Sequence, residues 1–166
     1  MILRMPSHID DFAGFPCLDA RRSVPSRRLG PPGPGLEALQ AMLQAASRVP
    51  DHGARVPFRF LRIAGEARTA LGEALASRKR EIDPDAPDAV LDKERLRFSH
   101  APVIVAVVAQ QGYDAKIPAS ERFSTASCVC FALLQAAQAA GFGAQWLTGW
   151  AASDPVVREL LGIGQD

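Results

Sequence analysis

The feature that most constrains the fold is a long stretch without charge. Between Arg122 and Asp154 the sequence contains no acidic or basic residue. Such a stretch could span a membrane, but Ser, Thr and Gln recur in it and "GFGAQW" at 141–146 interrupts it. A helix over about 120–140, apolar and small on nearly every side and followed by a strand, accounts for the pattern better. The chain is therefore expected to fold around one buried helix.

Composition indicates one globular domain of 166 residues, with 48% hydrophobic and 22% charged residues. The formal net charge of +1 gives no electrostatic reason to expect nucleic acid or a membrane as partner. Cys17, Cys128 and Cys130 are too few for a disulfide framework or a four-cysteine zinc site. The N-terminus lacks the apolar core of a signal peptide. A cytoplasmic protein is expected.

The hydrophobic periodicity predicts an α+β fold of mixed layers. Helices are predicted over 36–48, 66–80 and 89–98, and a last helix is capped by Ser153, with Pro155 in its first turn. Strands are predicted over 57–64, 102–109 and 144–150. The second has no polar side, which is typical of a central strand covered on both faces. Residues 1–20 give only a weak signal, with a short helix near Asp19.

The connection "RVPDHGARVPFRF" at 48–60 carries more charge than a turn requires. Arg48, His52 and Arg55 could hold an anion or polarise an oxygen. Read alone, "DHG" at 51–53 is more often a turn with a cation at a helix end. A metal site is disfavoured, because only His8 and His100 remain as further histidine ligands.

Two other segments are candidates for ligand binding. The triplet "RRS" at 21–23 offers two guanidinium groups and a hydroxyl, which suit a phosphate, although a short basic run is also common on surfaces. Trp146 and Trp150 could stack on a planar ligand or simply pack. "GFG" at 141–143 is not a dinucleotide fingerprint, because it lacks the third glycine and follows a helix.

Taken in order, these segments resemble the nitroreductase family of FMN-dependent enzymes. "RRS", "RVPDH", "PFRFLRI", "APVIVAVVA", "KIPASE", "AAGFGAQWLTG" and "SDPVVRELLGI" follow one another from Arg21 to the last residue. They are most similar to a short bacterial subgroup of NAD(P)H nitroreductases. The resemblance implies an N-terminal segment, 1–20, and a nitroreductase-like domain, 21–166, without the family's C-terminal strand and tail. It also implies a homodimer with a mixed sheet, surrounding helices and a buried central helix.

The resemblance also implies which residues bind ligands, with FMN lying at the subunit interface. "RRS" would hold the phosphate and ribityl end of FMN, two residues of the 48–60 connection would reach it from the other subunit, and "WLT" would lie near the flavin. "AAQAAG" matches a stretch assigned to NAD(P), whereas Lys116 and Glu121 match a pattern without an assigned role. The implied FMN contacts are Arg21, Arg22, Ser23, Arg48, His52, Trp146, Leu147 and Thr148, and the implied NAD(P) contacts are Ala136, Ala137, Gln138, Ala139, Ala140 and Gly141.

The function implied is that of an FMN-dependent oxidoreductase. It would use NAD(P)H to reduce nitroaromatic or quinone-like acceptors by a ping-pong hydride mechanism. No side chain is expected to act as catalyst and no metal is expected, because the cofactor carries the chemistry. Two alternatives remain open: a flavin-binding or degenerate scaffold without turnover, and a dimerisation module without cofactor. The first is suggested by "VPF" at 56–58, where the family usually has Gln-Pro-Trp, and by the absent tail.

Overall fold

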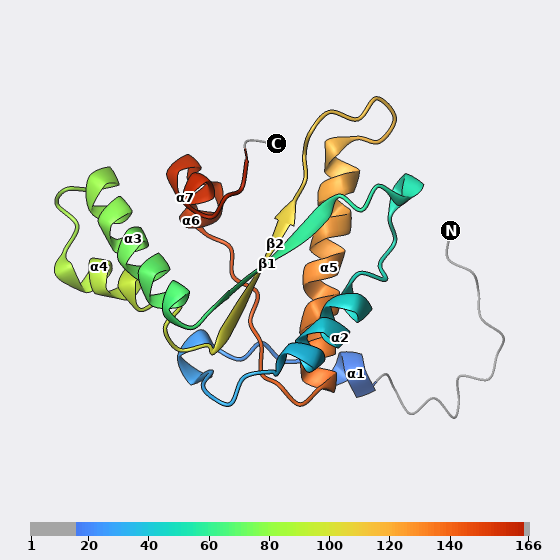
Figure 1. Cartoon of the computed structure of the whole chain (residues 1–166), viewed down its shortest axis with the longest axis horizontal. Helices are drawn as coiled ribbons and strands as arrows, with labels where there is room; N and C mark the ends of the chain where they lie inside the picture. The colour runs from blue at the N-terminus through green and yellow to red at the C-terminus, as the bar shows by residue number, and fades with distance from the viewer. Residues whose placement is uncertain (1–15, 165–166) are drawn as a thin grey trace.

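The computed structural model describes residues 16–164 and shows an α+β fold around one pair of strands (Figure 1). β1 (Phe58–Ala64) and β2 (Val103–Ala109) are antiparallel, with Phe58 opposite Ala109 and Ala64 opposite Val103. The other elements, in chain order, are α1 (Pro16–Asp19), η1 (Ser26–Arg28), α2 (Leu36–Ala46), η2 (His52–Ala54), α3 (Glu66–Ile82), α4 (Asp88–Arg95), α5 (Ala119–Ala139), α6 (Trp150–Ser153) and α7 (Pro155–Leu160).

The helices pack at two ends of the strand pair. Helix α5 lies beside β2 and packs against α2, and this end is filled by Ala46, Phe58 and Val129. Helices α3 and α4 form a hairpin at the opposite end, where α3 also contacts β1 and α7 (Figure 1). A second core cluster, which includes Ile63 and Leu75, fills that end. The strand pair thus joins two helical layers, and the helical hairpin lies between the first two strands as predicted.

The prediction of a third strand is wrong. Within residues 16–164 the segment 142–148 is extended but belongs to no sheet. It is held instead by the segment after α1: the Val24 N–H donates to the Ala144 carbonyl at 3.0 Å, and the Ser26 N–H donates to Gln145 Oε1 at 2.7 Å. The sheet has two strands, so β2 is paired on one side only and is not a central strand. Most of its residues are half-buried.

Helix α5 is long, as predicted, but it is not covered on every side within one chain. Its inner side buries Val129 completely, together with Ala126 and Arg122. Its outer side exposes Phe123, at 58% of its surface, and Phe131, at 44%. The absence of charged residues along α5 therefore does not mean that the helix is buried within this chain. None of the helices over 16–164 combines the length and the apolar character needed to cross a membrane.

The last helix begins one residue later than predicted. Asp154 is its N-cap, since its Oδ1 accepts hydrogen bonds from the backbone N–H groups of Val156 and Val157, both at 3.0 Å. Ser153, the expected cap, ends α6 instead. Pro155 occupies the first turn as predicted, because its ring fits the first helical position. Gly162 follows the helix with a φ of 63°, a value that favours glycine.

Candidate functional site

A cavity of about 340 Å³ lies against the C-terminal half of α5. Three segments that are distant in the sequence form its wall: the stretch after α1, helix α5 and the extended segment 142–148. No carboxylate is among the described residues that line it, so its only formal charge is one guanidinium group. The lining residues are Arg21, Ser23, Phe131, Leu134, Trp146 and Thr148.

The structure brings one cation and one hydroxyl of the predicted triplet into this cavity. Arg21 Nη1 lies 3.4 Å from Ser23 Oγ, and both residues line the wall. Arg22 is turned away, because its Nη1 donates to the backbone carbonyls of Asp19 at 2.7 Å and Arg21 at 2.9 Å. Its backbone N–H donates to Gln138 Oε1 of α5 at 3.1 Å. Arg22 therefore shapes the segment, and Arg21 presents its charge to the cavity.

In the segment 146–148, alternate side chains line the cavity, as expected of an extended chain. Trp146 and Thr148 line the cavity, whereas Leu147 does not and is 43% exposed. Successive side chains of an extended chain point to opposite sides, so residues two apart share a side. The geometry thus separates Leu147 from the other two predicted residues.

Sequence reasoning missed Phe131 and Leu134. They lie three residues apart on α5, a spacing that places both on one side of a helix. The sequence offered no sign of these two residues, because small apolar residues occupy nearly every side of the helix and no one side differs from the others. Together with Trp146 they supply the apolar and aromatic wall that a flat ring requires.

The predicted NAD(P) stretch, 136–141, is the end of α5 and the turn that follows. Ala137 is buried at 8% exposure, Gln138 is bonded to the N–H of Arg22, and 139–141 are exposed. This end of the helix carries partial negative charge, so an anionic pyrophosphate would gain nothing from the helix dipole here. Gln138 nevertheless places the stretch directly beside the triplet.

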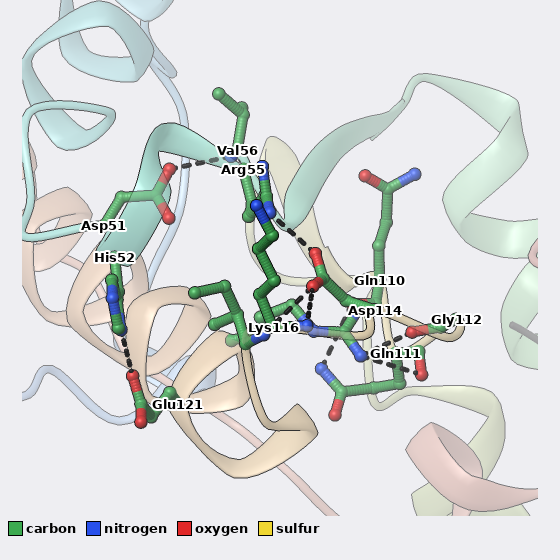
Figure 2. A network of polar contacts seen from close by, with 12 residues as sticks. Asp51, His52, Arg55, Val56, Gln110, Gln111, Gly112, Asp114, Lys116 and Glu121 are labelled. Carbon is green, nitrogen blue, oxygen red and sulfur yellow. Dashed lines mark hydrogen bonds and ion pairs between the residues drawn. The ribbon is translucent and has the colours of Figure 1, made fainter.

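A second cluster of polar side chains surrounds the loop between α2 and β1 (Figure 2). His52 Nδ1 lies 2.7 Å from Glu121 Oε2, in the first turn of α5. Arg55 Nε lies 2.7 Å from Asp114 Oδ2. The Val56 N–H donates to Asp51 Oδ2, also at 2.7 Å. The first contact attaches the loop to α5, the second attaches it to the connection between β2 and α5, and the third lies within the loop.

The same loop has an unusual backbone. Gly53, Ala54 and Val56 have φ values of 72°, 50° and 48°, in the left-handed region. This region is unfavourable for a β-branched residue such as Val56, so the surroundings must impose the conformation. Asp114 is one such constraint: hydrogen bonds from the backbone N–H groups of Lys116 and Ile117, with Arg55 nearby, hold the pKa of its carboxyl below the ordinary value despite some desolvation.

Arg122 is a structural residue that sequence reasoning did not identify. It is only 8% exposed, and its guanidinium group donates to the backbone carbonyls of Gln110, Gln111 and Gly112. One turn later, Thr125 Oγ1 donates to the Pro50 carbonyl at 3.2 Å. Helix α5 thereby fixes both the loop after β2 and the approach to His52.

The predicted FMN residues therefore lie in two separate places. Arg48 and His52 are exposed and do not line the cavity. His52 contacts Glu121, whereas the cavity uses Phe131 and Leu134. Ten or more residues of α5 separate these points, which corresponds to about 15 Å or more at the rise of an α-helix. One chain does not bring the two sets into a single cavity.

Comparison with known proteins identifies close relatives. The model of the Nitroreductase family matches residues 18–166. "Putative NAD(P)H nitroreductase YdjA" of Escherichia coli (strain K12) is 38% identical over 142 residues, covering 86% of this chain and 75% of that protein. A "Putative NAD(P)H nitroreductase" of Haemophilus influenzae is 32% identical over 146 residues, covering 87% and 77%.

Solved structures share the fold. A nitroreductase-like family protein from Bacillus cereus superimposes with a TM-score of 0.72 at 21% identity, covering 90% of this chain and 77% of that one. A nitroreductase with bound FMN from Bacteroides fragilis gives a TM-score of 0.65 at 23% identity, covering 90% and 79%. The α+β fold class predicted from the sequence is confirmed.

Proposed function

The chain belongs to the nitroreductase family, and from this premise we propose that it is an FMN-dependent oxidoreductase. It would use NAD(P)H to reduce electron-poor acceptors of the nitroaromatic or quinone type. The observation that carries the proposal is the cavity, because it combines a guanidinium group, two hydroxyls and an aromatic wall in one place. The E. coli and H. influenzae relatives bear NAD(P)H nitroreductase names, and the B. fragilis structure contains FMN.

The cavity residues fit FMN in chemical kind. Arg21 and Ser23 would bind the phosphate and ribityl end, since a guanidinium group and a hydroxyl donate to phosphate oxygens. Phe131, Leu134 and Trp146 would border the flat ring and exclude water from it. Thr148 offers a further hydroxyl to a polar edge. FMN, when bound, supplies the hydride-transfer chemistry, so none of these side chains needs to act as a nucleophile or base.

The NAD(P) contact over Ala136–Gly141 remains part of this proposal. Its exposed part is 139–141, and Gln138 ties it to the triplet through the Arg22 N–H. A reductant bound there would stand beside the cavity and could be exchanged for an acceptor, as a ping-pong cycle requires.

We expect the protein to work in the cytoplasm, where Cys128 and Cys130 would stay reduced.

We further propose that two copies of the chain form the working unit. The outer side of α5 exposes Phe123, Cys128 and Phe131 and carries no charged residue after Arg122. A continuous uncharged side of this kind is typical of a surface that a second copy covers. Pairing along α5 would also explain why Arg48 and His52 lie outside the cavity of their own chain, since they could then reach the cavity of the partner.

Replacing Phe123 with glutamate is expected to prevent pairing and, with it, retention of FMN. Phe123 is 58% exposed and outside the cavity, so the single chain should fold normally, whereas a dimer would have to bury an unpaired charge. Light scattering coupled to gel filtration would show a monomer in place of a dimer. Glu37→Gln, on the exposed side of α2, serves as control. A dimeric F123E protein would contradict this assignment of the interface.

The proposed function is tested by the colour of the purified protein. Protein supplied with FMN and then desalted is expected to keep the visible absorption of oxidised flavin. NADH or NADPH added without oxygen should bleach it, and a nitroaromatic or a quinone should restore it. Bound flavin that neither nucleotide bleaches would favour the scaffold without turnover. Protein that retains no flavin at all would contradict the proposal.

A further inference from the structure

The proposed function gives no role to Glu121, which contacts His52 in the loop cluster. The Nδ1–Oε2 distance is 2.7 Å, and the two side chains are 65% and 50% exposed. Exposed ion pairs contribute little to stability, because solvent screens them and the side chains lose freedom. A short, well-formed contact between residues 69 positions apart therefore invites an explanation other than stability.

The loop that carries His52 is constrained from several directions. Three of its residues have left-handed backbone, one of them the β-branched Val56. Asp51 accepts from the Val56 N–H, and Arg55 is paired with Asp114. Thr125 Oγ1 holds the carbonyl of Pro50 just before the loop. A conformation that is unfavourable locally and imposed by so many contacts is typical of a backbone that presents a functional group.

Glu121 fixes the direction of the imidazole ring. A carboxylate accepts hydrogen bonds but cannot donate them, so the proton of this contact must lie on His52 Nδ1. The other ring nitrogen, Nε2, then points away from Glu121, and it has no hydrogen-bond partner among residues 16–164. Because Glu121 sits in the first turn of α5, the ring is held by a rigid element and not by the loop alone.

We propose that Glu121 is a positioning residue that directs His52 Nε2 toward the FMN bound by a second copy of the chain. The inference rests on the proposed function, since His52 would meet FMN only across the dimer. In the neutral ring Nε2 would accept a hydrogen bond from the flavin or its ribityl chain, and in the protonated ring it would donate one. Its direction is the same in both states, because Nδ1 stays bonded to Glu121.

The proposal is tested by a double-mutant cycle measured as FMN affinity of the cofactor-free protein. Glu121→Ala and His52→Ala are each expected to weaken binding by about 3- to 10-fold, the range for loss of one hydrogen bond. The double variant should be no weaker than His52→Ala alone, because Glu121 acts only through the ring. Glu73→Ala is the matched control: Glu73 is 56% exposed and pairs with Arg95 at 2.9 Å on the distant helical hairpin. It should bind FMN as the wild type does.

A second readout needs no cofactor. In a nitrogen-detected NMR spectrum of the free protein, the neutral His52 ring should carry its proton on Nδ1, and Glu121→Ala should move it toward Nε2. This readout shows that Glu121 sets the tautomer of the ring, whereas the FMN affinities show that the direction of the ring serves the cofactor. An unchanged tautomer, or additive losses of FMN affinity in the double variant, would overturn the positioning role.

The outcomes also separate this inference from the function beneath it. If wild-type protein binds FMN but His52→Ala binds it equally well, the positioning role fails and the proposed function stands. If wild-type protein binds no FMN, both fail.

Discussion

Replacing Arg21 with alanine is expected to weaken FMN binding by about 1.5–3 kcal/mol, the contribution of a hydrogen bond to a charged group. This corresponds to a loss of affinity of about 10- to 150-fold. Arg21 is the one charged residue among the described residues that line the cavity, so none of these neighbours can replace it. The loss would be measured by titrating FMN into cofactor-free protein and following the quenching of flavin fluorescence.

Arg27→Ala is the control for charge. Arg27 is exposed in η1 of the same segment, but it does not line the cavity. The Arg27→Ala substitution removes the same charge. It should change FMN affinity by less than about 3-fold, since exposed charges at a distance are screened by salt. Equal losses for the two variants would mean that the segment attracts FMN only by its general charge. Unchanged affinity in Arg21→Ala would contradict the assignment of the cavity.

Replacing Gly72 with alanine is expected to destabilise the fold by about 1–3 kcal/mol or more. Gly72 is buried in α3, facing the end of α4. A Cβ atom added there would overlap the carbonyl oxygen of Arg95 and lie 3.0 Å from its carbonyl carbon. Helix propensity alone predicts the opposite sign, because alanine is better than glycine in a helix by about 1 kcal/mol. The clash involves backbone, which cannot rotate away. We therefore expect the clash to cost more stability than the better helix propensity of alanine contributes.

Chemical denaturation would show the loss as a lower midpoint with an unchanged slope. Gly30→Ala is the control, since a Cβ atom at Gly30 would meet nothing within 4 Å. Because none of the described residues that line the cavity belongs to α3 or α4, Gly72→Ala should bind FMN normally at a temperature where it is folded. An equally or more stable variant would show that α3 and α4 can separate without cost.

The sequence predicted those elements that depend on local pattern. Helices α2 and α3 and strands β1 and β2 were found because their periodicity or β-branched composition is a local property. The predicted third strand does not form: "AQWLTGW" has the composition of a strand, but composition does not show which partner the segment will meet. Here the Ala144 carbonyl accepts from the Val24 N–H, and the Gln145 side chain accepts from the Ser26 N–H. At the last helix Asp154 is the cap, because its carboxylate accepts from two backbone N–H groups and Pro155 fits the position that follows it.

The sequence indicated some of the residues that meet in the candidate site, but not its geometry. Arg21, Ser23, Trp146 and Thr148 do meet in one cavity, which the order of the motifs suggested. Phe131 and Leu134 escaped notice because burial of α5 was inferred from composition. Composition does not distinguish cover by the same chain from cover by another copy. The pairing of His52 with Glu121 joins positions far apart in the sequence, and no local pattern reports such a contact.

The place of the helical hairpin bears on how such a protein can change over evolution. Ala64 and Val103 are directly opposed in the strand pair, so the chain leaves for α3 and returns from α4 at neighbouring points. A segment whose two ends meet can be lengthened, shortened or exchanged without moving the backbone on either side of it. The helical hairpin can therefore diverge in sequence and length, while the residues proposed to bind the cofactor keep their spacing.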